Sequence, residues 1–107
     1  IKKFNNRYFG INYDTGNSAA LNYDVDQEFK YYGKYIYNIH IKDREKFGNT
    51  VRLGYGNANF NKLFKNLKKI NYRGNLILQT ARSKMNKHLE EIKINLSFIK
   101  KIQNENR

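Results

Sequence analysis

Residues 35–41 read Tyr-Ile-Tyr-Asn-Ile-His-Ile and decide the fold class of the chain. The segment is short and rich in β-branched and aromatic side chains, which is typical of a buried β-strand. Two similar segments lie on either side of it, Phe-Gly-Ile-Asn-Tyr-Asp at 9–14 and Leu-Ile-Leu-Gln at 76–79. The sequence therefore predicts three buried strands, each ending in polar residues.

Each predicted strand is followed by apolar residues at helical spacing. After the first strand, Asp24 and Gln27 form a capping-box pattern that opens a helix, and its apolar face consists of Val25, Phe29 and Tyr32. After the second strand, Asn59 is expected to cap a helix with the stripe Phe60, Leu63, Phe64, Leu67 and Ile70. The last helix is predicted over about 87–103, with the buried stripe Leu89, Ile92, Leu96, Ile99 and Ile102. The order β-α-β-α-β-α predicts an α/β fold with parallel strands.

The length and composition exclude several classes of protein. A chain of 107 residues suits a single domain, residues 1–107, and is too short for two ordinary domains. It has no run of about 18 apolar residues, so we expect no membrane span. The absence of Cys excludes disulfides and thiolate zinc sites and leads us to expect a cytoplasmic location.

The formal net charge of +12 raises the question of a polyanionic partner. The basic residues occur together with abundant Asn, Ile and Tyr, and all of these residue types have AT-rich codons. An AT-rich coding sequence therefore accounts for the charge whatever the function, and we do not expect nucleic acid as the partner. A non-catalytic, basic polyanion-binding module stays open as an alternative function.

Strand alternation places most of the polar side chains on a common face. Residues 10, 12 and 14 share a face of the first strand, as do residues 36, 38, 40 and 42 of the second, and residues 77 and 79 of the third. Ligands of parallel α/β folds bind at the carboxyl ends of the strands. The carboxyl ends of the three predicted strands are therefore the candidate site.

Asp14, His40 and Gln79 end the three predicted strands. A carboxylate and an imidazole suit a divalent ion such as Mn²⁺, Zn²⁺ or Co²⁺, and the amide oxygen of Gln79 would be a weaker third ligand. Two alternatives stay open for single residues: a strand-end Asp also caps helices, and a lone His is often a hydrogen-bonded core residue. A further carboxylate would be needed to complete a metal site.

Three stretches carry a family resemblance: Asn12 to Ala19 (NYDTGNSA), Asn38 to Arg44 (NIHIKDR) and Leu53 to Phe60 (LGYGNANF). In this order and spacing they resemble the sugar-phosphate isomerase/epimerase group of the xylose-isomerase-like TIM-barrel superfamily. The resemblance implies a partial TIM barrel made of three consecutive parallel β-α units, the carboxyl-terminal portion of an eight-unit barrel.

The resemblance also implies a ligand set. The superfamily holds its metal with Glu, Asp, His and Glu from successive strands. The resemblance assigns Asp14 to the Asp of this set and His40 to its His. Gln79 falls where the last Glu is expected, and the first Glu would lie on a strand before Ile1. Asn17 stands where endonuclease IV has a second His of its three-zinc cluster, so that cluster is not expected here. His88 is expected to be a solvated helix residue.

The activity implied by the resemblance is enolisation of the carbon next to a carbonyl group, in an isomerase or epimerase of a sugar or sugar phosphate. An amide accepts no proton at neutral pH, so the departure at Gln79 puts a two-glutamate mechanism in doubt. The residues given a catalytic role are Gln79 and Lys42. Asn17 is expected to bind a substrate hydroxyl.

An anionic substrate is expected from the groups around the same strand ends. The loop glycines Gly54 and Gly56 permit a close approach of backbone N–H groups to a phosphate. The basic side chains expected to contact the anion are Lys42, Arg44 and Arg82. Three β-α units do not close a barrel, so an inactive barrel remnant and a homo-oligomer both stay open.

Overall fold

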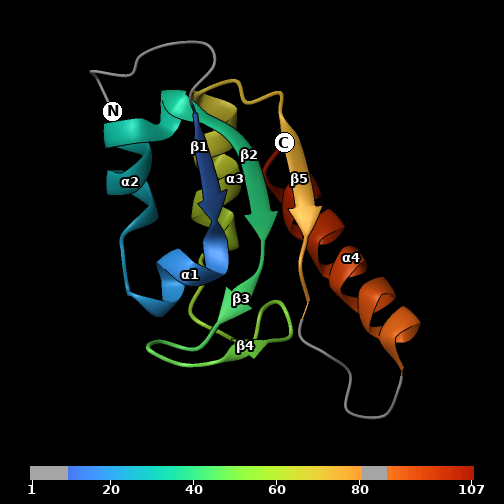
Figure 1. Cartoon of the computed structure of the whole chain (residues 1–107). Helices are drawn as coiled ribbons and strands as arrows, with labels where there is room; N and C mark the ends of the chain where they lie inside the picture. The colour runs from blue at the N-terminus through green and yellow to red at the C-terminus, as the bar shows by residue number, and fades with distance from the viewer. Residues whose placement is uncertain (1–9, 81–86) are drawn as a thin grey trace.

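The computed structural model describes residues 10–80 and 87–107 and has the predicted α/β architecture (Figure 1). Its main sheet consists of β1 (Ile11–Asp14), β2 (Ile36–Ile41) and β5 (Asn75–Leu78), in the order β1-β2-β5, and both pairings are parallel. The three predicted strands are thus confirmed within one or two residues at each described end, and Phe9 lies outside the described residues.

Helices follow the strands as predicted, and they gather on one side of the sheet (Figure 1). α2 (Val25–Tyr32) and the 3₁₀ helix η2 (Gly33–Tyr35) precede β2, α3 (Phe60–Lys69) precedes β5, and α4 (His88–Glu105) follows it. The three parallel β-α units form part of a TIM barrel. None of the helices in the described ranges is both long enough and apolar enough to cross a membrane.

Besides η2, two local features were not expected from the sequence. α1 (Thr15–Ala20) begins directly after β1, and a short antiparallel pair, β3 (Asp43–Arg44) and β4 (Thr50–Val51), follows β2. Both are too short to show an apolar period. They are specified by hydrogen bonds of single side chains, described below.

The core lies between the sheet and the helices. Ile39 and Ile41 of β2 are almost completely buried there, against a cluster that includes Phe29 of α2 and Leu63 and Phe64 of α3. Burying each such side chain contributes about 1.5–3 kcal/mol. The opposite face of the sheet carries the polar residues of alternate positions and is covered by no helix of the described chain.

A bulge corrects the predicted face of Ile36. Ile11 pairs with Ile36 while Asn12 pairs with Asn38, so β2 has one extra residue, Tyr37, at this point. Because a bulge shifts the alternation by one residue, Ile36 is turned into the core and Tyr37 is 62% exposed. The prediction that Ile36 shares the face of Asn38 and His40 is therefore wrong.

The helix starts agree in part with the sequence. The side chain of Asn59 accepts from the backbone N–H of Lys62 at 3.0 Å, as its predicted role as the cap of α3 requires. The capping box at Asp24 is wrong: its side chain makes no cap hydrogen bond and instead pairs with Lys62 Nζ at 3.1 Å. A cation within reach attracts the carboxylate away from the backbone.

The predicted stripe of α4 is buried only toward the end of the helix. Ile99 is buried and Ile102 is half-buried, whereas Leu89 is 67% exposed and Ile92 and Leu96 are also exposed. The second half of α4 packs beside α3, and its first half extends beyond β5, the last strand of the described sheet (Figure 1). The prediction of a fully buried stripe is therefore wrong, because the neighbouring layer ends too early.

Candidate functional site

Asp14 and His40 lie side by side at the carboxyl ends of neighbouring strands. Their Cα atoms are register partners in the parallel β1–β2 pair, so both side chains start from the same face of the sheet. This is the open, polar face, opposite to the one covered by the helices. Asp14 and His40 are each half-buried, so both keep access to solvent.

The strand-end carboxylate has two roles available to it. Oδ1 of Asp14 accepts from the backbone N–H of Asn17 at 2.8 Å and caps α1, which was the alternative considered for a strand-end Asp. The second carboxylate oxygen has no hydrogen-bond partner within the described residues. Capping therefore uses one oxygen and leaves the other for a ligand.

Asn17 connects the carboxylate to a predicted anion contact. Its amide oxygen accepts from Arg44 at 3.0 Å, and the Arg44 guanidinium also donates twice to the carbonyl oxygen of Gly48, at 3.0 and 2.8 Å. The structure thus brings Asp14, Asn17 and Arg44 together at one end of the sheet. The hydrogen bonds fix the guanidinium in place and leave the amide N–H₂ group of Asn17 free to donate.

His40 lies in a row of asparagine amides on the open face. Nδ2 of Asn38 donates to Oδ1 of Asn12 at 3.2 Å and lies 3.4 Å from Nε2 of His40. Oδ1 of Asn38 is buried and has no hydrogen-bond partner among the described groups. An unpaired buried acceptor costs about 1–3 kcal/mol, so this atom is complementary to a donor brought from elsewhere.

The role of this amide row was missed by the sequence analysis. Strand alternation placed Asn12 and Asn38 on the face of Asp14 and His40, which was the available signal. A hydrogen bond between side chains 26 positions apart depends on strand register, which alternation does not give.

Gln79 continues the ladder of the third strand. Its backbone N–H donates to the carbonyl oxygen of Ile41 at 2.9 Å, so it lies one residue beyond the end of β5. His40 is the register partner of Ile77. Because alternate residues of a strand share a face, Gln79 lies on the side of the sheet that carries His40, and it is exposed.

Lys42 lies over the start of α1. Its backbone N–H and carbonyl oxygen both bond to the hydroxyl of Thr15, at 2.9 and 2.6 Å. A Cβ added at Gly16 would meet Cγ of Lys42 at 2.8 Å, so only Gly leaves room for the aliphatic stem. The ammonium has no partner within the described parts of the chain.

The loop of Gly54 and Gly56 is organised by a carboxylate that the sequence analysis did not single out. The fully buried Asp43 accepts from the backbone N–H groups of Gly54, Gly56 and Ala58, at 2.9, 3.0 and 2.9 Å. The two glycine N–H groups predicted to face a phosphate are therefore already engaged by an acceptor. A signal existed in the sequence, since Asp43 lies two residues after the strand and one residue after Lys42.

Two further residues have predicted roles: Arg82 is expected to contact the anion, and His88 is expected to be solvated. Arg82 lies outside the described residues. His88 is exposed and begins α4, which confirms its expected position on a solvated helix.

The donor set fits a divalent ion in part. The free oxygen of Asp14 and the imidazole of His40 are the ligand types that Mn²⁺, Zn²⁺ and Co²⁺ accept. Within the described residues no three His, Cys, Asp or Glu side chains lie close enough together to hold a metal. The described chain thus offers two strong donors, with the Gln79 amide as the additional oxygen on the same side of the sheet.

Comparison with known proteins agrees with this architecture. No curated protein matches the chain. The family model described as xylose isomerase-like TIM barrel matches residues 1–102, which is nearly the whole sequence. The chain belongs to the xylose isomerase-like TIM barrel family.

Proposed function

We propose that this chain is part of a metal-dependent isomerase or epimerase that acts on a sugar phosphate. Membership of the xylose isomerase-like family supports a role in a sugar-processing enzyme. The observation that carries the finer proposal is the register pairing of Asp14 with His40 on the open face of the sheet. Opposite ends or faces for these two side chains would have excluded a shared ion.

In this proposal Asp14 and His40 hold the metal, and Gln79 contributes its amide oxygen. A bound divalent ion supplies Lewis-acid stabilisation of the negative charge that develops on the substrate oxygen during enolisation. The remaining carboxylate ligands would come from parts of a barrel other than the described strands. The unpaired Oδ1 of Asn38 would accept from a substrate hydroxyl close to His40.

Proton transfer cannot be assigned to Gln79, because an amide accepts no proton at neutral pH. Gln79 is therefore proposed to orient the substrate through its amide. Lys42 is the ionisable side chain nearest in sequence to His40 on the same strand face, and its ammonium is not engaged by the described residues. Lys42 is proposed to hold a proton next to the substrate oxygen at Nζ.

The anionic group of the substrate is proposed to bind Lys42 and Arg44, with Arg82 as a further contact. Arg44 is positioned by Asn17 and Gly48 and still has N–H groups to spare. The backbone N–H groups of Gly54 and Gly56 are bound to Asp43, so phosphate recognition would depend on basic side chains.

The test is a metal titration of the whole chain. Binding of Co²⁺ is followed by its visible absorption, and binding of Mn²⁺ and Zn²⁺ by calorimetry. Asp14→Ser removes the carboxylate and keeps a good helix cap, and His40→Gln removes the imidazole. We expect each change to weaken binding by about tenfold or more, equivalent to at least about 1.4 kcal/mol.

The matched control is His88→Gln, which changes the other, exposed His of the chain and should leave metal affinity unchanged. Wild-type affinity in both Asp14→Ser and His40→Gln would overturn the proposal. Tight nucleic-acid binding that depends steeply on salt and has the same affinity in Asp14→Ser, His40→Gln and the wild-type chain would instead support the polyanion-binding module.

A further inference from the structure

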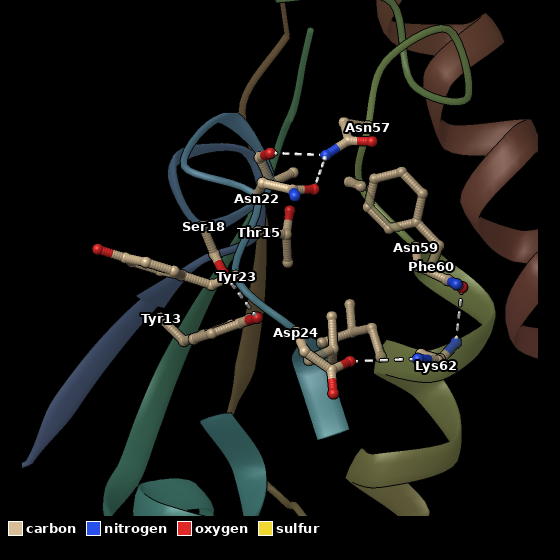
Figure 2. Close-up of a pocket in the computed structure, with 14 residues that line it drawn as sticks. Tyr13, Thr15, Ser18, Asn22, Tyr23, Asp24, Asn57, Asn59, Phe60 and Lys62 are labelled. Atoms are coloured by element: carbon tan, nitrogen blue, oxygen red, sulfur yellow. Dashed lines mark hydrogen bonds and ion pairs between the residues drawn. The ribbon is translucent and has the colours of Figure 1, made fainter. Parts of the chain in front are cut away.

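A cavity of about 300 Å³ lies in the helical layer, between α1, the start of α2 and the start of α3 (Figure 2). It is separate from the face of Asp14 and His40, because its walls belong to the side of the sheet that the helices cover. This size is at the lower end of the range for small-molecule sites.

The charge of the lining favours a neutral ligand. The two charged residues that line the cavity, Asp24 and Lys62, pair with each other at 3.1 Å, and Lys62 also lies 3.4 Å from Asp26 outside the lining. The lining therefore has no net charge, although the whole chain carries +12. An anion would find the Lys62 ammonium already neutralised and a carboxylate beside it.

Three of the four hydroxyl groups of the lining, those of Tyr13, Thr15 and Ser18, are already engaged. Tyr13 and Ser18 both donate to the carboxylate of Glu28, the former at 2.8 Å, and Thr15 is bonded to Lys42. Burial, together with the nearby carboxylate, raises the pKa of Tyr13 well above its ordinary value, so its hydroxyl keeps its proton and its bond to Glu28. A ligand must therefore find its partners elsewhere in the lining.

Three asparagine amides supply those partners. Asn57 donates from Nδ2 to the carbonyl oxygen of Ala19 and to Oδ1 of Asn22, and Asn59 uses Oδ1 to cap α3. The side-chain oxygen Oδ1 of Asn57 and the side-chain N–H₂ groups of Asn22 and Asn59 have no hydrogen-bond partners within the described chain. Figure 2 shows Asn22 and Asn57 at one end of the cavity, and Asp24 and Lys62 at the other.

The remaining wall is apolar. The ring of Phe60 lies beside the cavity in Figure 2, and Val25, Ala58 and Leu63 also line it. A ligand that fits must present C–H groups to this wall and must both donate to and accept from amides. Hydroxyl groups do both.

We propose that this cavity binds a small neutral polyhydroxylated molecule of the monosaccharide type. The binding needs no metal and uses none of the residues of the proposed metal site.

The experiment titrates the ¹⁵N-labelled whole chain, in the presence of a metal chelator, with glucose and separately with glucose 6-phosphate. We expect glucose, at millimolar concentrations, to shift the side-chain amide resonances of Asn22, Asn57 and Asn59. Glucose 6-phosphate should bind no more tightly, because the lining offers no unpaired cation.

Two variants remove free amides with little expected effect on the fold. Asn22 has a φ of 58°, which Gly adopts readily, so Asn22→Gly removes the amide and keeps the backbone. Asn59→Ser keeps a good helix cap. Each should weaken glucose binding by about three- to tenfold, the effect of one hydrogen bond. Asn71→Gly, at a φ of 55° and outside this cavity, is the matched control.

Three outcomes would overturn the proposal: no shift with glucose, shifts that avoid the three asparagines, or equal weakening by Asn71→Gly. Tighter binding of glucose 6-phosphate at these amides would also overturn it. Wild-type metal affinity in Asp14→Ser and His40→Gln would overturn only the proposed function, so the failure of one proposal is distinguishable from the failure of the other.

Discussion

At the scale of single residues, side chains with fixed hydrogen-bond partners shape the end of the sheet where the candidate site lies. Asp14 starts α1, Asn17 holds Arg44, and Asp43 holds the loop that leads to α3. All three are short polar side chains that accept hydrogen bonds, from backbone N–H groups at Asp14 and Asp43 and from the Arg44 guanidinium at Asn17. The position of the proposed anion contacts therefore depends on residues that need not touch the substrate.

Asp43 gives the sharpest prediction at this scale. Asp43→Asn replaces one carboxylate oxygen by an N–H₂ group that faces backbone N–H donors. Hydrogen bonds to a buried charged group contribute about 1.5–3 kcal/mol, so we expect the free energy of unfolding to fall by about 3 kcal/mol in urea denaturation. Hydrogen exchange at the N–H groups of Gly54, Gly56 and Ala58 should accelerate.

The matched control for Asp43 is Asp24→Asn, because Asp24 is exposed and its pair with Lys62 lies at the surface. Such a pair contributes about 0–1 kcal/mol. Equal losses of stability in the two variants would show that Asp43 is not the organiser of the loop.

At the scale of secondary-structure elements, α4 is attached to the rest of the molecule by a polar clamp. The buried Asn95 accepts from the backbone N–H of Leu53 at 2.9 Å and donates to the carbonyl oxygen of Glu91 at 2.7 Å. Glu91 in turn pairs with Arg52. Beside them, Gly54 has a φ of 90°, and an added Cβ would lie 2.7 Å from the ring of Phe98, so the helix and loop fit closely.

We predict that Asn95→Ala loosens α4. It removes the only side-chain partner that the described chain gives to the N–H of Leu53, and an unpaired buried donor costs about 1–3 kcal/mol. Hydrogen exchange in α4 should accelerate while that of β2 changes little. The control is Ser97→Ala, on the exposed side of the same helix; an equal change there would argue against the clamp.

The same clamp predicts a dependence on pH. The hydrogen bond from Arg52 lowers the pKa of Glu91 below its ordinary value of 4.5. A carboxyl whose pKa is lower in the folded state than in the unfolded chain stabilises the folded state at pH values above its unfolded-state pKa. This contribution disappears as the pH falls through the lowered pKa of the folded state. Protection of the α4 amides against hydrogen exchange, measured relative to the unfolded chain at the same pH, should therefore fall below about pH 4.5, the ordinary value of a Glu carboxyl.

Glu91→Gln should abolish this part of the pH dependence, because its amide does not titrate. Glu90→Gln, one residue earlier and exposed, is the control and should keep it. A pH response that persists unchanged in Glu91→Gln would contradict the assignment to this carboxyl.

At the scale of the whole molecule, three parallel strands leave apolar surface uncovered. Leu76 and Ile77 of β5 are partly exposed, as are Leu89, Ile92 and Leu96 of α4. The charge of +12 opposes self-association at low ionic strength. We therefore expect the chain to form oligomers as salt screens this charge, measured by light scattering over a salt series.

Ile92→Lys should suppress that association with little loss of stability, because the side chain is already exposed. Tyr31→Lys, on an exposed position of α2, is the control for added charge. Association that is unchanged in Ile92→Lys would place the contact elsewhere on the molecule.

The sequence by itself determined the α/β class, the three strands and their order along the chain, because buried strands and amphipathic helices have different apolar periods. It also placed Asp14, His40 and Gln79 at strand ends, because alternation and parallel order fix which end and which face they share. The cap at Asn59 was readable because it depends on residues three positions apart.

Only the tertiary structure decided the rest, because those features depend on groups far apart in the sequence. The bulge at Tyr37 reverses the face of Ile36. The carboxylate of Asp24 pairs with Lys62 instead of capping α2. The carboxylate of Asp43 accepts from the N–H groups of Gly54 and Gly56. The exposure of Leu89 follows from where β5 ends the sheet. Local periodicity reports which side of an element is apolar, whereas packing determines whether anything covers that side.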